Sequence, residues 1–322
     1  MIRLQALTKT YATPKGSVSA VDRVSLEVHE GETCVLLGPS GCGKTTTLRM
    51  INRLVVPTSG KIFLNGRDTD SVDPVELRRG IGYVIQQIGL FPNMTVAENI
   101  GVVPRLLGWD AVRRRRRAEE LLSLLALPPA DFADRYPNEL SGGQAQRIGV
   151  ARALAVDPPV LLMDEPFAAL DPVNREAIQD EFLRMQRTLR KTILFVSHDI
   201  DEAVKMADRI AIFHAGRLVQ FAPPDELLAH PADTFVAGFV GSDRTLKRLR
   251  LIRVREVLAP VGDRTFAMNA PHVSPDDDLR RVAALFLEHG NESLVCVDSS
   301  SRVLGVVTRE AIAQRLALQD AQ

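Results

Sequence analysis

Hydrophobic and polar residues alternate along two segments near the start of the chain, residues 2–5 and 24–28. Alternation with a period of two places the apolar side chains on one face, so both segments are predicted to form half-buried antiparallel strands. Three later runs are short and almost entirely apolar: residues 33–37, 160–163 and 192–197. Gly, Pro or polar residues bound these runs, which are therefore predicted to be strands buried within a sheet.

Helical patterns lie between these strands. One helix is predicted over residues 110–126, opening near Asp110 and ending before Pro128-Pro129, and a helix of mixed charge is predicted over 173–190. Residues 76–100 mix Gly and Pro with short apolar runs, which predicts a strand followed by a loop. Strands that alternate with helices are typical of an α/β core around a largely parallel sheet.

The composition changes near the middle of the second half of the chain, where basic residues gather. Residues 241–253 are predicted to be a basic linker between a domain spanning 1–240 and a small α+β domain spanning 254–318. The small domain has a strand–helix–strand–strand–helix pattern, with an amphipathic helix over 276–289 and strands over 293–297 and 303–307.

Composition narrows the classes of function. The chain has 322 residues, 45% hydrophobic and 25% charged, as is typical of soluble globular proteins. Forty Lys and Arg balance forty Asp and Glu, so nucleic acid is not an expected partner. The cysteines Cys34, Cys42 and Cys296 form no CxxC pair, which favours a reducing compartment. We expect no secretory signal and no membrane span, so any work at a membrane is expected to go through a partner.

The segment Gly38-Pro39-Ser40-Gly41-Cys42-Gly43-Lys44-Thr45 fits the pattern GxxxxGK[ST], between a predicted strand and a helix. Its glycines allow successive backbone N–H groups to cradle phosphate oxygens. Lys44 is predicted to reach the β- and γ-phosphates of ATP and the Thr45 hydroxyl to bind Mg²⁺, while Cys42 contributes its backbone N–H rather than a reactive thiol. The residues assigned to nucleotide binding here are Gly38, Pro39, Ser40, Gly41, Cys42, Gly43, Lys44, Thr45 and Thr46.

Two carboxylates, Asp164 and Glu165, directly follow the apolar run 160–163. The carboxyl ends of strands are where α/β sheets bind ligands. Asp164 suits the coordination shell of Mg²⁺, and Glu165 is placed to polarise a water beside the γ-phosphate. The alternative is a strand followed by an acidic helix cap, but the phosphate loop upstream favours the catalytic interpretation.

The segment Leu140-Ser141-Gly142-Gly143-Gln144 resembles the signature of the ATP-binding cassette (ABC) family, and the resemblance covers roughly residues 2–235. It implies a P-loop NTPase (RecA-like) core with antiparallel β and α-helical subdomains, the helical one over about residues 88–155. In the family, this signature closes on ATP held by the other subunit, which implies a homodimer that hydrolyses ATP with Mg²⁺. The residues assigned to the ATP of the other subunit are Ser141, Gly142, Gly143 and Gln144. A mild departure follows at Ala145, where a polar residue is commoner.

Two further positions resemble nucleotide-contacting residues of the family. Tyr11 resembles the aromatic residue that stacks on adenine, although a tyrosine on a strand face is the structural alternative. Gln86 resembles the glutamine that touches Mg²⁺ and water and links to the membrane subunit. Because Gln87 follows directly, the assignment carries a one-residue ambiguity, and Gln86 is preferred because the preceding strand is expected to end there.

Two more family positions lie after the paired carboxylates. Asp171, in Ala169-Leu170-Asp171, resembles the D-loop that communicates across the dimer. His198 resembles the switch histidine that holds the γ-phosphate, with a structural histidine as the alternative. The predicted catalytic residues are Glu165, His198, Gln86 and Lys44, and the predicted metal-binding residues are Thr45, Gln86 and Asp164.

Five consecutive arginines, Arg113 to Arg117, lie within the predicted helix 110–126. On a helix they spread around most of the circumference, so they cannot all face one partner. A solvated face with Glu119 and Glu120 as partners is the favoured interpretation. The alternative is a contact with membrane-subunit loops or anionic headgroups.

The junction at residues 239–249 resembles that of ATPases from bacterial importers of glycine betaine, choline and carnitine. The resemblance implies import of a quaternary-amine osmoprotectant, with membrane permease subunits as partners and an extracytoplasmic substrate-binding protein as an indirect one. It also implies a peripheral position at the cytoplasmic face of the bacterial inner membrane. An importer ATPase for another small solute, or a soluble non-transport ABC ATPase, are the alternatives.

The small domain, with Gly305-Val306-Val307-Thr308, resembles a single CBS module, a type that usually comes in tandem. Two chains of a dimer would supply a pair. Ala311 stands where nucleotide-binding modules often carry a ribose-binding Asp, and Glu310 beside it would lie on another helix face. Nucleotide binding and simple dimerisation both remain open.

The basic residues between Arg244 and Arg255 offer a regulatory hypothesis. Cations near an anionic membrane are attracted by about 1 kcal/mol each, and salt screens this attraction. Screening of the stretch would couple internal salt to the position of the small domain. The alternative is that these cations only solvate a linker.

Overall fold

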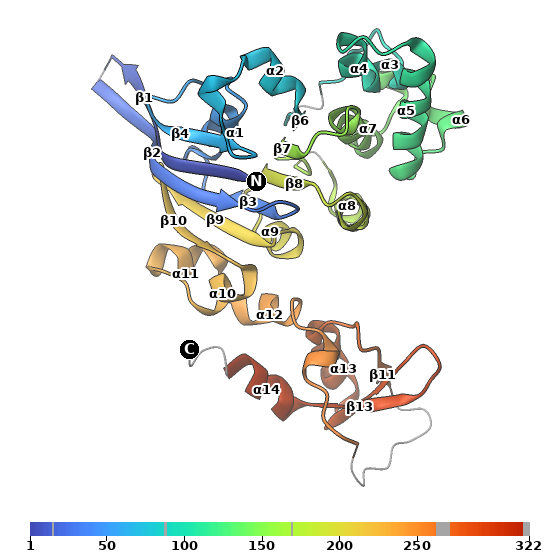
Figure 1. Ribbon diagram of the computed structural model, residues 1–322. Coiled ribbons are helices and arrows are strands. Elements are labelled where there is room, and N and C mark those ends of the chain that lie inside the picture. Colours follow the sequence, from blue (N-terminus) through green and yellow to red (C-terminus); the bar gives the residue numbers. More distant parts are fainter. Residues whose placement is uncertain (15, 87–88, 169, 262–270, 318–322) are drawn as a thin grey trace. The chain divides into compact units, whose positions relative to one another are not determined.

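The computed structural model describes residues 1–14, 16–86, 89–168, 170–261 and 271–317 (Figure 1). The chain divides into two compact units, Met1–Phe221 and Ala222–Gln322. Within the described ranges, no helix is both long and apolar enough to cross a bilayer.

A six-stranded sheet forms the centre of the first unit, in the strand order β10-β9-β3-β8-β7-β6. Its strands are β3 (Thr33–Leu37), β6 (Ile81–Val84), β7 (Val160–Asp164), β8 (Thr192–Val196), β9 (Arg209–His214) and β10 (Arg217–Ala222). The five strands from β9 to β6 pair in parallel. Every residue of β3, β7 and β8 is buried, which confirms the buried strands predicted from their apolar runs.

A second sheet of four antiparallel strands has the order β2-β1-β4-β5. Its strands are β1 (Ile2–Thr13), β2 (Gly16–Val28), β4 (Ser59–Leu64) and β5 (Arg67–Asp68). Ile2 pairs with Val28 and Leu4 with Leu26, and all four side chains are buried, as the alternating pattern predicts. The core between the two sheets includes the apolar residues of α1 (Lys44–Ile51).

Five short or medium helices gather in one subdomain beside the central sheet (Figure 1): α3 (Val96–Ile100), α4 (Val102–Leu106), α5 (Ala111–Leu124), α6 (Pro129–Phe132) and α7 (Gly142–Leu154). The other helices of the first unit, besides α1, are α2 (Pro74–Arg79), α8 (Pro172–Leu189) and α9 (Ile200–Met206). Within the subdomain, α3, α5, α6 and α7 pack against one another. Asp110 caps α5 by accepting a hydrogen bond from the Arg113 N–H at 2.8 Å, so the predicted start of this helix is confirmed.

The prediction of a strand and then a loop over 76–100 is wrong at both ends of that segment. Its first residues complete α2, and its last five form α3. Thr95 and Glu98 form a capping box that fixes the start of α3. Helices of five or six residues are too short to show a helical period in the sequence, so their caps were the only signal.

The second unit contains α10 (Pro224–Ala229), α11 (Thr234–Val240), α12 (Arg244–Leu249), α13 (Leu279–His289), α14 (Arg309–Ala317) and the sheet β11-β12-β13. Its strands are β11 (His272–Val273), β12 (Ser293–Val297) and β13 (Val303–Thr308). The predicted strand–helix–strand–strand–helix order is confirmed. The helix predicted from residue 276 begins later, because the Asp278 carboxylate caps it by accepting from the Arg281 N–H at 2.9 Å.

The segment predicted as a basic linker is structured. Part of it forms α12, and Leu249 and Ile252 belong to the apolar core of the second unit. Arg248 is only 3% exposed, and its Nε lies 3.0 Å from Oδ1 of Asp225 on α10. Its Nη2 also contacts the carbonyl oxygen of Leu316 on α14 at 3.5 Å. The cation therefore joins three helices instead of solvating a linker.

Candidate functional site

The glycine-rich loop connects the end of β3 to the start of α1. Two of its glycines are required by close backbone approaches. A Cβ on Gly38 would lie 2.3 Å from the Phe213 carbonyl oxygen, and a Cβ on Gly43 would lie 2.3 Å from that of Ala20. Both residues also have positive φ, 148° and 105°. Only glycine fits at these two positions, so the loop can follow the tight path that a phosphate cradle requires.

Lys44 is folded back onto this loop. Its side chain is 6% exposed, and its Nζ donates hydrogen bonds to the carbonyl oxygens of Gly38 at 2.7 Å and Pro39 at 2.9 Å. The ammonium is thus held over the loop, where the predicted β- and γ-phosphates would lie. Cys42 is buried, and its Sγ lies 3.6 Å from the same Nζ, consistent with a structural role for this thiol.

A hydrogen bond joins the loop to the end of β7. The Thr45 hydroxyl donates to Oδ1 of Asp164 at 2.9 Å. Burial raises the pKa of the Asp164 carboxyl, while the Thr45 hydrogen bond opposes that rise. Hydroxyl and carboxylate oxygens are ligands that Mg²⁺ accepts, with substrate phosphates and water completing its shell. The two side chains therefore fit the predicted metal role.

Glu165 lies at the centre of three predicted catalytic side chains. Gln86 Nε2 donates to its Oε2 at 3.0 Å, and the Nδ1 of His198 lies 3.5 Å from its Oε1. The three residues follow β6, β7 and β8, so the carboxyl edge of the parallel sheet brings them together. The contacts expected of the family glutamine, with Mg²⁺, water and the membrane subunit, stay predictions for Gln86, and Gln87 lies outside the described residues.

The signature segment caps a helix in the helical subdomain. The Ser141 N–H donates to Oε1 of Gln144 at 2.9 Å, and the Gln144 N–H donates to Ser141 Oγ at 3.4 Å. Ser141 and Gly142 are exposed at the start of α7, while Gly143 is partly buried. Within the described residues, no hydrogen bond joins this segment to the glycine-rich loop.

The remaining predicted positions lie apart from this cluster. Tyr11 is 42% exposed on β1, and the Lys9 ammonium lies 5.0 Å from the centre of its ring. Asp171 is exposed immediately before α8, and Ala169 of the same segment lies outside the described residues. The roles of Tyr11 and Asp171 stay predictions.

Several functional candidates were missed from the sequence. Ser197 and Glu202 are buried beside His198, and Arg175 lies 3.6 Å from Asp199. Arg175 resembles a solvated residue on the helix of mixed charge, and no local pattern marks Ser197 and Glu202 as partners of each other.

The arginine run has internal partners, as its favoured interpretation predicts. Arg115 and Arg116 pair with Glu119 and Glu120 one turn later, at 2.7 and 3.2 Å. The Arg113 guanidinium lies 3.6 Å from the centre of the Trp109 ring. The run is therefore largely satisfied within the helical subdomain.

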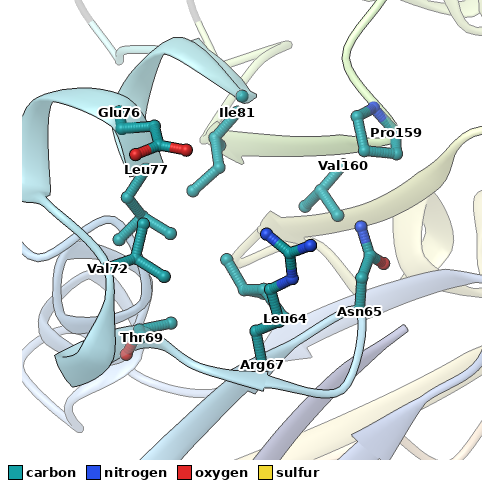
Figure 2. Close-up of a pocket in the computed structure, with 11 residues that line it drawn as sticks. Leu64, Asn65, Arg67, Thr69, Val72, Glu76, Leu77, Ile81, Pro159 and Val160 are labelled. Carbon is teal, nitrogen blue, oxygen red and sulfur yellow. The ribbon is translucent and has the colours of Figure 1, made fainter.

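A cavity of about 410 Å³ lies elsewhere in the first unit (Figure 2). Ile81 and Val160, the first residues of β6 and β7, form part of its wall, with Leu64 and Val72 opposite. It therefore lies at the amino edge of the sheet, whereas Glu165 lies at the carboxyl edge. The cavity is therefore separate from the predicted phosphate site.

Helix α14 carries the position at which a ribose-binding carboxylate would be expected in the small domain. Ala311, at the position predicted for a ribose-binding carboxylate, donates its backbone N–H to Thr308 Oγ1 at 3.1 Å. Glu310 is exposed, while Ala311 is partly buried against the core. The neighbouring glutamate thus occupies a different face of α14, as predicted.

Comparisons with known proteins agree with this arrangement. A family model for ABC transporters matches residues 21–168, and one for the CBS domain matches residues 261–318. The chain is 58% identical over 310 residues to the osmoprotectant import ATP-binding protein OsmV of Salmonella typhimurium, covering 96% of this chain and 79% of that protein. It is 50% identical over 317 residues to the glycine betaine/carnitine/choline transport ATP-binding protein OpuCA of Bacillus subtilis, covering 98% and 80%.

The solved structures similar to this chain include a dimeric post-hydrolysis state of the ATP-binding cassette MJ0796 bound to ADP and Pi. That match has a TM-score of 0.62 and 37% sequence identity, and it covers 69% of this chain and 98% of that chain. The fold of the first unit is thus shared with a nucleotide-binding cassette.

Proposed function

Because this chain belongs to the family of ABC transporter ATP-binding proteins, we propose that it hydrolyses ATP to energise import of a quaternary-amine osmoprotectant. Relatives named for osmoprotectant import and for glycine betaine, carnitine and choline transport support this substrate class. In the proposed division, residues 1–240 bind nucleotide and residues 254–318 form the CBS domain.

One observation carries the enzymatic part of the proposal. The Thr45–Asp164 hydrogen bond of 2.9 Å joins the phosphate loop to the strand end at which Gln86 and His198 meet Glu165. Phosphoryl transfer needs positioning and charge stabilisation more than covalent chemistry from the protein. This cluster supplies a cradle, oxygen ligands and a carboxylate base at one edge of the sheet.

The residues have distinct roles in the proposed hydrolysis. Loop N–H groups and the Lys44 ammonium bind the phosphate oxygens of ATP. Thr45 and Asp164, with Gln86, would hold Mg²⁺, and the bound ion would neutralise negative charge on the phosphates. Glu165 orients the attacking water and accepts its proton, while Gln86 holds the carboxylate in place.

His198 and the signature segment complete the proposed site. His198 donates a hydrogen bond to the γ-phosphate from its place beside Glu165. Ser141, exposed at a helix start, binds the ATP held by a second copy of the chain. A homodimer is therefore needed, and the dimeric cassette structures similar to this chain support that assembly.

The proposed partners and location follow from the importer assignment. Membrane permease subunits would carry the solute, and an extracytoplasmic substrate-binding protein would act through them. The ATPase would lie peripherally at the cytoplasmic face of the bacterial inner membrane. Solute choice would then belong to those partners.

Uptake in the native host tests this function. Deleting the gene is expected to reduce uptake of labelled glycine betaine, choline or carnitine at high osmolarity. The wild-type gene should restore uptake and a Lys44→Ala gene should not, because its loop lacks the phosphate-binding ammonium. Loss of uptake of a sugar, metal or polyamine alone would overturn the substrate class. Absence of Mg²⁺-dependent ATP hydrolysis by the purified chain would overturn the enzymatic part.

A further inference from the structure

A buried carboxyl group lies beneath the turn that carries His198. Glu202 is 7% exposed on α9, and it has no role in the hydrolysis described above. Its Oε2 accepts a hydrogen bond from Ser197 Oγ, and its Oε1 accepts one from Gln179 Nε2 at 3.2 Å. Burial raises the pKa of Glu202, while these two hydrogen bonds lower it. Both carboxyl oxygens are thus satisfied, as a buried polar group requires.

The Ser197 hydroxyl fixes the turn on both sides of the histidine. It donates to Glu202 and accepts from the Asp199 N–H at 3.0 Å. The Ser197 N–H also donates to the Leu36 carbonyl oxygen at 3.0 Å, which ties the same turn to β3. The backbone around His198 is therefore held through Ser197.

The other partner of Glu202 lies on α8, the helix that begins directly after Asp171. Gln179 is 5% exposed, so its bond to Glu202 is shielded from water. In a low dielectric, a fully satisfied polar network strongly favours one arrangement of its members. Ser197, Glu202 and Gln179 thus form a buried connection between the histidine turn and α8.

A second connection runs parallel to the first. Arg175, near the start of α8, donates from Nη2 to the Leu170 carbonyl oxygen at 2.9 Å. Its Nη1 lies 3.6 Å from Oδ2 of Asp199, the residue after the histidine. Arg175 therefore ties the segment before α8 to the turn after β8.

The buried carboxyl is also close to the proposed base. Glu165, Ser197, His198 and Glu202 line one cavity of about 20 Å³. This volume is about that of a single water site. Ser197 and Glu202 therefore lie close to the side chains of Glu165 and His198.

We propose that Glu202 is a positioning residue that holds His198 beside Glu165 by anchoring Ser197 to helix α8. This inference rests on the proposed roles of Glu165 and His198 in ATP hydrolysis. Because α8 starts at the segment containing Asp171, a shift of that segment reaches the histidine turn through the same contacts. The network thereby links the predicted dimer-contacting segment to the hydrolytic site.

Variants of Glu202 in the full chain test the proposal. Glu202→Met keeps the side-chain length but removes both acceptors, so Ser197 loses its anchor. We expect kcat to fall about tenfold to a hundredfold, as for a catalytic group displaced by roughly an ångström, with KM for ATP unchanged within about twofold. Glu202→Gln should retain most of the activity, because it keeps an acceptor for Ser197 and the Gln179 amide can reverse.

Two more variants make the result specific. Ser197→Ala removes the donor from the other side and is expected to give the same kcat loss, even if Glu202→Met folds poorly. Lys205→Met is the matched control, because it removes a different contact between α9 and α8, the 2.7 Å ion pair with Asp180. This control is expected to keep the wild-type kcat.

The outcomes separate this inference from the function on which it rests. Wild-type kcat in both Glu202→Met and Ser197→Ala, with an inactive Glu165→Gln, would overturn the positioning role alone. Equal losses in Lys205→Met and Glu202→Met would also overturn it, because general loosening of α8 would then explain both. Full activity in Glu165→Gln would instead contradict the proposed catalytic function.

Discussion

At the scale of single residues, Glu165 has an unusual backbone. Its φ is 48°, in the left-handed region that a side chain such as glutamate rarely occupies. Such a residue costs roughly 1–3 kcal/mol and persists where its surroundings hold it. The Glu165 N–H donates to the Val196 carbonyl oxygen at 3.1 Å, and Gln86 binds its carboxylate. These two contacts hold the backbone and the carboxylate of the residue proposed as the base.

Glu165→Gln tests that assignment. The amide keeps the size and most hydrogen bonding of the side chain but cannot accept the proton of water. We expect retained ATP binding, an ATP-bound dimer that persists, and turnover reduced about a hundredfold to ten-thousandfold. Phosphate release and analytical ultracentrifugation measure these properties. Glu76→Gln, an exposed position at the opposite edge of the sheet, is the control. Near-normal turnover in Glu165→Gln would remove Glu165 from this role.

At the scale of elements, buried apolar runs were predictable and buried charges were not. Strands β3, β7 and β8 could be predicted because every position is buried and their sequences are almost entirely apolar. The polar residues that end these runs also predicted that Asp164 and His198 lie at the ends of strands. Arg248 lies in a basic run that resembles a solvated surface. Its partner Asp225 lies 23 residues upstream, and only the packing of α10 on α12 brings the two together. Pairs of this kind depend on tertiary contacts that local patterns do not record.

Arg248→Gln is expected to destabilise the second unit. Removing one member of a buried pair leaves the other charge without its partner, at a cost of about 3 kcal/mol. Hydrogen exchange of the α14 amides in the full chain measures this loss. Because the Arg248 side chain is buried, the loss should persist across ionic strength, unlike an effect of screened surface cations.

Arg244→Gln provides the matched control for this measurement. Arg244 lies on the same helix, and the described residues include no side-chain hydrogen bond or ion pair for it. Its substitution is expected to leave α14 protection unchanged. If the α14 amides are protected equally in the Arg248→Gln and Arg244→Gln variants, the structural role of Arg248 is contradicted. Salt sensing by the basic residues between Arg244 and Arg255 would then be the favoured hypothesis.

At the scale of the whole molecule, the two segments predicted to bind nucleotide lie in different parts of the first unit. The phosphate loop leads into α1 between the two sheets, whereas Ser141 begins α7 in the helical subdomain. The described residues include no hydrogen bond between these segments. Under the proposed function, the cradle of one chain and the exposed signature of a second copy form one complete site.

Mixing two inactive variants tests this arrangement. Lys44→Ala removes the phosphate-binding ammonium, and Ser141→Arg blocks the signature, so each variant is expected to be inactive alone. A mixed dimer has one intact site, because both defects fall on the other. If the sites act independently, an equal mixture should regain roughly a quarter of wild-type activity, since about half of the dimers are mixed.

A crosslink resolves the outcome in which mixed dimers form but stay inactive. That result would mean either that the signature does not act on the other chain or that both sites must be intact. Ser141→Cys and Ser40→Cys in opposite chains place one thiol at the signature and one in the phosphate loop. The native cysteines Cys34, Cys42 and Cys296 are all buried, so they should not compete. A disulfide that forms only with ATP would confirm the shared site and show that both sites must be intact. Heterodimers that never crosslink with ATP would contradict sharing between chains.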